Sequence, residues 1–111
     1  MSFLRACGVA DVASGSALAV DVDGVDVAVV HDGDDWYAVE DECTHASIPL
    51  SEGDVEGCEI ECWLHGSRFD LRTGKPSGPP AIIPVATFAV QVDGDDVLVD
   101  VDKPTNDRPT D

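Results

Sequence analysis

Residues 43–45 of the chain read Cys-Thr-His, and residues 62–67 read Cys-Trp-Leu-His-Gly-Ser. The two segments form a C-x-H motif and a C-x-x-H motif, so each supplies one thiolate and one imidazole. Zinc and iron–sulfur clusters both accept this mixture of sulfur and nitrogen ligands. A structural zinc site usually takes two cysteines from one knuckle and two histidines from one helical turn. One ligand of each kind per motif instead favours a 2Fe–2S cluster with two cysteines on one iron and two histidines on the other.

The length of the chain, 111 residues, suits one domain that folds without disulfide bonds. No apolar run is long enough to span a membrane. The first residues also lack the basic and apolar regions of a secretion signal. We therefore expect a cytoplasmic protein with no membrane partner.

Acidic side chains dominate the composition. The chain has 23 Asp and Glu residues but only 6 Lys and Arg residues, which gives a formal net charge of −17. Such a field repels nucleic acid and anionic membranes. Two interpretations stay open: an acidic docking face for a basic protein, or a whole surface adapted to molar salt. So much charge on so small a body favours the second, a halophilic source.

Outside the motifs the chain consists of short apolar runs separated by turn residues, a pattern typical of antiparallel all-β proteins. Asp-Gly pairs at 23–24, 32–33 and 93–94 predict tight hairpin turns. We expect no long helix, and at most one helical turn over residues 46–50. The expected strands cover residues 3–7, 17–21, 25–31, 36–40, 54–56, 59–62, 68–70, 88–92 and 97–101.

Three further features of the sequence bear on its organisation. Residues 103–111 lack apolar periodicity and predict a flexible acidic tail. The proline-rich residues 73–84 predict a rigid surface loop, and Pro79 follows the second motif closely enough to cover a bound cluster. Cys7 and Cys58 belong to neither motif, and we expect two small buried thiols rather than a disulfide.

The segments C-T-H at 43–45 and C-W-L-H-G-S-R-F-D at 62–70 resemble those of the bacterial and archaeal Rieske-type ferredoxins. These small proteins carry electrons for ring-hydroxylating and related non-heme iron oxygenases. The resemblance implies an all-β fold, an antiparallel β-sandwich over residues 1–102 with a small cluster-binding subdomain over about residues 41–80. It also implies one Rieske-type 2Fe–2S cluster as the cofactor.

The resemblance implies that Cys43 and Cys62 bind the inner iron and that His45 and His65 bind the outer iron, near the surface. Phe69 stands where high-potential members carry a tyrosine hydroxyl, so we expect a potential toward the low end of the Rieske range, near about −150 mV. Ser67 matches the second hydroxyl donor of those members. The residues expected around the cluster are Trp63, Gly66, Ser67 and Pro79.

The implied function is one-electron transfer from a reductase to a terminal acceptor such as a non-heme iron oxygenase, by a protein that is not itself an enzyme. The residues agree, because no glycine-rich nucleotide loop is present and only His31 is left for a second metal set. Two alternatives stay open. One is the small Rieske-like subunit of an assimilatory nitrite reductase. The other is a redox sensor or cluster-handling protein beside iron–sulfur assembly machinery.

Overall fold

The structure is a computed structural model that describes residues 3–42, 49–62, 68–77, 84–102 and 104–105. Of the four candidate ligands, Cys62 is within these ranges. The remaining candidate site residues lie outside the described residues: Cys43, His45, Trp63, His65, Gly66, Ser67 and Pro79.

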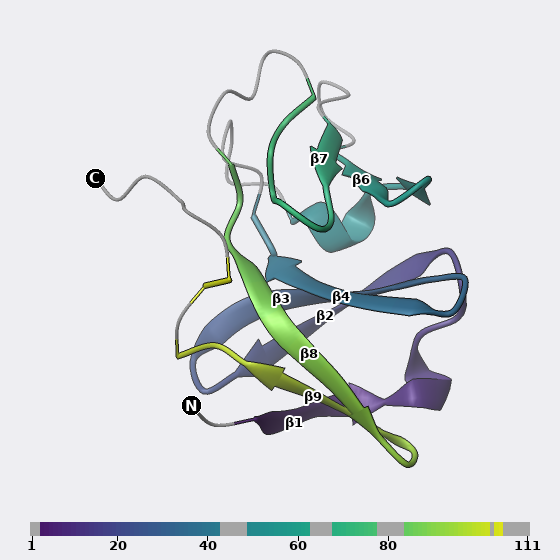
Figure 1. Ribbon diagram of the computed structural model, residues 1–111, viewed down its shortest axis with the longest axis vertical. Coiled ribbons are helices and arrows are strands. Elements are labelled where there is room, and N and C mark those ends of the chain that lie inside the picture. The colour runs from purple at the N-terminus through teal and green to yellow at the C-terminus, as the bar shows by residue number, and fades with distance from the viewer. Residues whose placement is uncertain (1–2, 43–48, 63–67, 78–83, 103, 106–111) are drawn as a thin grey trace.

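The described residues form nine antiparallel strands and two short 3-10 turns, and contain no α-helix (Figure 1). Every expected strand is present, with its bounds shifted by at most one residue. Of the turn expected over residues 46–50, residues 46–48 lie outside the described residues, and Leu50 begins the observed turn η2. The elements are β1 (Leu4–Gly8), η1 (Val9–Asp11), β2 (Ser16–Val22), β3 (Val25–Asp32), β4 (Asp35–Glu40), η2 (Leu50–Glu52), β5 (Val55–Glu56), β6 (Glu59–Glu61), β7 (Arg68–Asp70), β8 (Thr87–Asp93) and β9 (Asp96–Asp100).

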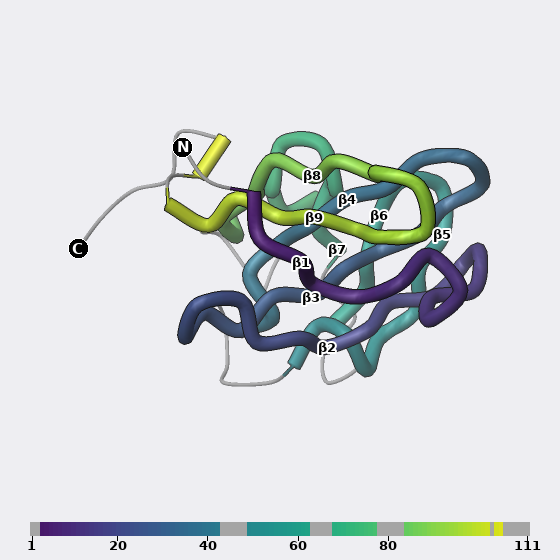
Figure 2. The backbone as a smooth tube through the Cα atoms, turned by 90° about the horizontal axis from the view of Figure 1, so that it is seen from below, coloured from purple at the N-terminus to yellow at the C-terminus, as the bar shows by residue number. Residues whose placement is uncertain are grey.

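The strands make two sheets, one of six strands in the order β1-β9-β8-β4-β3-β2 and one of three in the order β5-β6-β7. The larger sheet is continuous only where Ala38 pairs with Phe88 and Val39 with Thr87. At this narrow junction it folds, so that β1, β9 and β8 lie against β2, β3 and β4 (Figure 2). This is the expected antiparallel β-sandwich.

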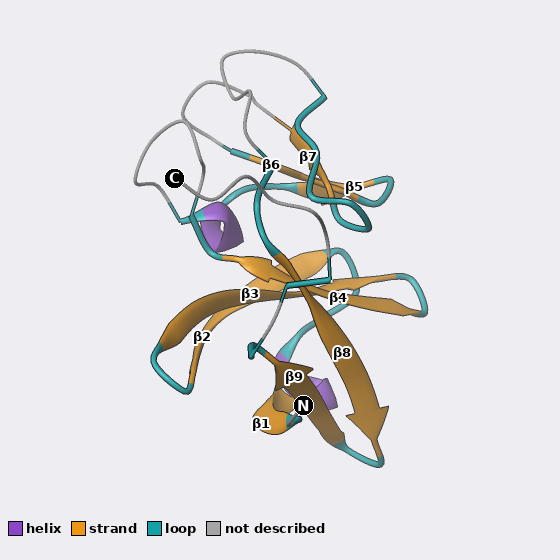
Figure 3. Cartoon of the chain, turned by 60° about the vertical axis from the view of Figure 1, so that its left-hand side comes forward, coloured by secondary structure: helices purple, strands orange, loops and turns teal. Residues whose placement is uncertain are grey.

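Strands β3 and β4 form a middle layer, with the three-stranded sheet on one side and β1, β9 and β8 on the other (Figure 3). Because side chains alternate along a strand, Val27 and Val29 of β3 face one core while Ala28 and Val30 face the other. The sandwich core contains Cys7, Val12, Val22, Val27, Val29, Ala38, Ala86, Phe88, Val97 and Val99. The subdomain core contains Ala28, Val30, Val39, Leu50, Ile60, Cys62, Phe69, Leu71 and Val85.

All three Asp-Gly pairs lie at hairpin turns, as expected, but they occupy two different registers. Asp23 and Gly24 are the two loop residues between paired Val22 and Val25, with φ values of 51° and 82°. In the other two hairpins the aspartate is the last paired strand residue, and a glycine opens the loop with a positive φ. A positive φ at the first loop position is what two-residue hairpins require.

The described part of the expected tail is held against β8. The Thr105 N–H donates a 2.7 Å hydrogen bond to the Thr87 carbonyl, and the two threonine hydroxyls lie 2.6 Å apart. The boundary of the tail at residue 103 and its flexibility stay predictions, because residues 103 and 106–111 lie outside the described residues. Among the described residues, no helix has both the length and the apolar character that crossing a membrane requires.

Candidate metal centre

Cys62 follows the last residue of β6 and is 1% exposed, a free thiol packed in the subdomain core. Glu61, just before it, pairs with Arg68, the first residue of β7. The antiparallel pairing therefore holds the two ends of the second motif side by side. A thiol buried among apolar side chains fits a sulfur ligand that is shielded from solvent.

The two ends of the first motif segment are also joined. Asp41 precedes it and Ser51 follows it, and both side chains are half-buried. One carboxylate oxygen of Asp41 accepts a 2.7 Å hydrogen bond from the Ser51 N–H, and the other accepts a 2.9 Å bond from the Ser51 hydroxyl. Hydrogen bonds to a carboxylate are among the stronger ones in proteins.

The chain around η2 connects the two motifs. A side chain at Gly53 would collide with the carbonyl of Glu61, so the two backbones are in direct contact. The Glu61 N–H donates to the Asp54 carbonyl at 2.8 Å, and the Ser77 N–H donates to the Arg68 carbonyl at 2.8 Å. Hydrogen bonds and backbone contacts thus connect the described residues on either side of segments 43–48 and 63–67 with the residue that precedes segment 78–83.

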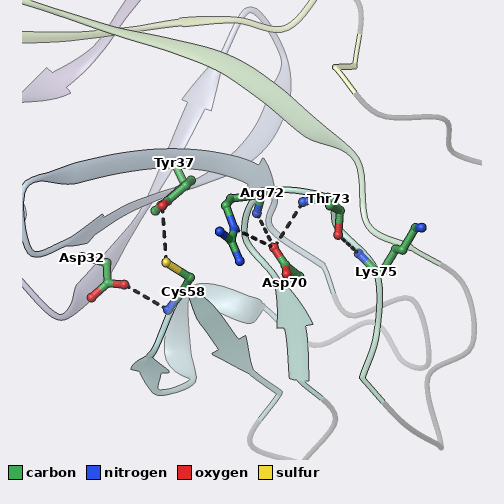
Figure 4. A network of polar contacts seen from close by, with 7 residues as sticks. All are labelled: Asp32, Tyr37, Cys58, Asp70, Arg72, Thr73 and Lys75. Carbon is green, nitrogen blue, oxygen red and sulfur yellow. Dashed lines mark hydrogen bonds and ion pairs between the residues drawn. The ribbon is translucent and has the colours of Figure 1, made fainter.

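Charged side chains line the three-stranded sheet. Arg68 lies between Glu59 and Glu61 of the neighbouring strand, at 3.6 and 3.4 Å. Asp70 accepts hydrogen bonds from the Arg72 and Thr73 N–H groups and lies 3.6 Å from the Arg72 guanidinium (Figure 4). Exposed ion pairs of this kind add little stability, whereas the two N–H bonds to Asp70 shape the turn that follows β7.

At the other end of the three-stranded sheet, Cys58 joins the subdomain to the sandwich (Figure 4). Its N–H donates to the Asp32 carboxylate at 3.0 Å, and its Sγ lies 3.4 Å from the Tyr37 hydroxyl. The pKa of Tyr37 is raised to about 12, and the hydrogen bond with Cys58 is the largest cause and burial the second. The Cys58 backbone is left-handed, with φ at 63°, which costs a residue with a Cβ about 1–2 kcal/mol.

The expectation of two buried thiols is right for Cys7 and wrong for Cys58. Cys7 is 5% exposed, and burial raises the pKa of its thiol. Cys58 is half-buried, because the hairpin loop that carries it lies at the edge of the sheet. Both thiols are free, as expected.

The polar residues that join these segments were not predicted from the sequence. Asp and Ser commonly bind free N–H groups where a helical turn begins. Their presence at positions 41 and 51 is the signal in the sequence that could have indicated this contact. Tyr37 and Cys58 carry no such signal, because they meet only through the packing of the two sheets.

Residues 2–89 match the Rieske [2Fe-2S] domain family. The chain belongs to this family. It is 39% identical over 102 residues to the ferredoxin component of biphenyl 2,3-dioxygenase from Rhodococcus jostii, covering 92% of this chain and 95% of that one. It is 40% identical to the 3-phenylpropionate/cinnamic acid dioxygenase ferredoxin subunit of Escherichia coli K12, covering 91% and 95%.

Among solved structures, the ferredoxin of carbazole 1,9a-dioxygenase from Nocardioides aromaticivorans superimposes with a TM-score of 0.84 at 42% identity, covering 89% of this chain and 97% of that one. The cofactor of this Rieske-family chain is therefore one Rieske-type 2Fe–2S cluster rather than zinc. Like these ferredoxins, the chain is a one-electron carrier and not itself an enzyme.

Proposed function

We propose that this protein is the ferredoxin component of a dioxygenase system that hydroxylates aromatic rings. It accepts single electrons from a reductase and passes them to a non-heme iron oxygenase. The observation that carries this proposal is the match with ferredoxin components of aromatic dioxygenases, which spans about nine-tenths of the length of both chains. The same match favours an electron carrier over a nitrite reductase subunit or a cluster-handling protein.

We assign the cluster to Cys43 and Cys62 on one iron and to His45 and His65 on the other. The bound cluster supplies reversible one-electron redox chemistry. Burial of Cys62 and the joined ends of the two motif segments support this assignment. Neutral imidazole ligands in place of two thiolates raise the reduction potential above that of all-cysteine clusters.

The proposed surroundings of the cluster are Trp63, Gly66, Ser67 and Pro79, with Trp63 and Pro79 excluding water. Phe69 is fully buried in the subdomain core and has no hydroxyl to donate. A second hydroxyl donor is therefore missing from this position, and we expect a potential near the low end of the Rieske range, about −150 mV.

We further propose that the protein works in the cytoplasm of a halophilic organism. The excess of 23 acidic over 6 basic side chains supports a surface adapted to molar salt. The acidic docking face is the competing interpretation, and the salt dependence of folding distinguishes the two.

The test of the function is an electron paramagnetic resonance spectrum of the dithionite-reduced protein after anaerobic purification. We expect the rhombic signal with a low average g value that marks histidine ligation of one iron. A higher average g value, as in all-cysteine clusters, would overturn the assignment of His45 and His65. A colourless protein that binds one zinc ion would refute the electron-transfer function.

A further inference from the structure

The two hydrogen bonds between Asp41 and Ser51 differ from the carboxylate contacts within turns, and, unlike the long-range bond from the Cys58 N–H to Asp32, they use both carboxylate oxygens. Asp11, Asp21 and Asp70 accept N–H groups from residues two or three positions away, within their own turns. Asp41 instead reaches a residue ten positions along the chain and uses both of its oxygens. It therefore closes the segment between residues 42 and 50 at its base, rather than shaping a local turn.

Asp41 lies close in the sequence to a proposed anionic ligand. Cys43 is the proposed thiolate ligand, so Asp41 carries a second negative charge two residues earlier in the sequence. Like charges at short range repel one another. The two hydrogen bonds from Ser51 stabilise the charged carboxylate at this place.

The same contact extends to the second motif. Ser51 lies in η2, which runs into Gly53 and Asp54. Gly53 touches the Glu61 carbonyl, and Asp54 accepts the Glu61 N–H. A displacement of Ser51 would therefore be transmitted through the backbone to the residue that precedes Cys62.

We propose that Asp41 and Ser51 form a clamp that joins the two described ends of the chain that carries Cys43 and His45, and links them to the β6 backbone just before Cys62. Both are positioning residues, because neither is assigned as a ligand. The proposal rests on the proposed function. Closing a loop before its ligand binds removes chain entropy that binding would otherwise have to overcome, so the clamp retards cluster loss.

The test measures the rate at which the purified holoprotein loses its visible absorbance to an excess of iron chelator. Asp41→Ala removes both hydrogen bonds, and we expect cluster loss about 10- to 100-fold faster than in the wild type, the range for residues that support metal ligands. Asp11→Ala is the matched control, because it removes the same charge and a carboxylate bond to the Gly8 N–H at 2.8 Å, outside the cluster-binding subdomain. We expect it to lose the cluster at the wild-type rate.

Asp41→Asn separates the clamp from the charge. The amide oxygen still accepts the Ser51 N–H, and the amide nitrogen donates to the Ser51 hydroxyl, so both contacts survive without the charge. A near-wild-type rate for Asp41→Asn, with a raised reduction potential, supports the clamp. A rate equal to that of Asp41→Ala would assign the effect to charge and overturn the proposal.

Equal rates for Asp41→Ala and Asp11→Ala would also overturn it. Should Asp41→Ala yield no holoprotein, Ser51→Ala decides, because it removes only the hydroxyl bond. A wild-type rate for Ser51→Ala would then refute the clamp, and an intermediate rate would support it. A wild-type protein without the Rieske signal would instead refute the proposed function, so the two failures are distinguishable.

Discussion

Cys7 and Cys62 are both buried free thiols, but they lie in different cores. Cys7 packs in the sandwich core with Val97 and Val99, and Cys62 packs in the subdomain core with Ile60 and Phe69. Burial alone therefore does not distinguish a ligand from a packing residue. The distinction comes from position, since only Cys62 lies where β6 leads into the second motif.

This difference predicts opposite outcomes for the same substitution. Each Cys→Ala variant removes one buried sulfur and costs about 1 kcal/mol of folding stability. Cys62→Ala also removes a soft thiolate donor that iron requires, so we expect loss of the visible absorbance of the cluster. Cys7→Ala should keep that absorbance. A holoprotein with a normal spectrum from Cys62→Ala would contradict the ligand assignment.

Tyr37 predicts a pH dependence at the alkaline end. Its pKa is raised to about 12 in the folded protein, above about 10 in the unfolded chain. Between these values the folded state binds more protons, so stability falls as pH rises through this window and is full below it. Tyr37→Phe should flatten the decline, measured by denaturant midpoints from pH 9 to 12. An unchanged decline would contradict the Tyr37–Cys58 contact as its cause.

Among the elements, β3 was predicted correctly as a strand, but the alternating pattern did not show that both of its faces are covered. Its residues Val27–Val30 form a continuous apolar run and are all fully buried. Such a run signals a strand covered on both faces, whereas the expectation from the sequence was a strand like the other short apolar ones. The strand was predicted correctly, and the layer on its second face was not.

The contact between η2 and β6 predicts a sharp position dependence for glycine substitutions. Gly53→Ala forces a Cβ into the Glu61 backbone, which cannot move without displacing Cys62, and we expect a cost of about 1–3 kcal/mol. Cluster occupancy, measured as iron per chain, should fall with it.

Gly57→Ala provides the comparison. Gly57 has a positive φ of 59°, and a Cβ at this position would project into open space. Gly57→Ala should lower folding stability only by the cost of a left-handed backbone, about 1–2 kcal/mol. Cluster occupancy should therefore stay at the wild-type level. Equal occupancy in the two variants would show that η2 does not position the second motif.

Over the whole molecule, basic side chains are unevenly distributed. Arg68, Arg72 and Lys75 lie on or beside β7, whereas Arg5 is the only basic residue in the described part of the sandwich. The carboxylates of the sandwich therefore repel one another with little basic compensation, and only dissolved ions screen them.

This imbalance predicts that folding depends on salt. The thermal midpoint of the holoprotein should rise steeply between dilute buffer and molar KCl, by about 4–8 °C for each kcal/mol of repulsion that is screened. Sucrose is the control, because it stabilises folded proteins by exclusion and does not screen charge. The same midpoint in dilute buffer and in concentrated KCl would refute the halophilic interpretation.

Much of the fold could be predicted from the sequence, because apolar alternation and Asp-Gly turns are local signals. The chain from Phe88 to Val101 shows both, and its hairpin has the expected strands. The candidate ligands were predicted from motif spacing, and Cys62 alone lies in the described residues. The clamp of Asp41 and Ser51 and the Tyr37–Cys58 contact were not predicted, since each joins residues that approach one another only after the sheets pack.

The burial of β3 on both faces has a consequence for how the cluster is acquired. Amides covered from both sides exchange with solvent only when much of the molecule opens, so Val27–Val30 should be the slowest to exchange deuterium. Cys62, the assigned ligand within the described residues, packs in the subdomain core and not in the sandwich core. We therefore expect the sandwich half to stay folded in the apoprotein, with cluster binding completing the subdomain that covers the other face of β3.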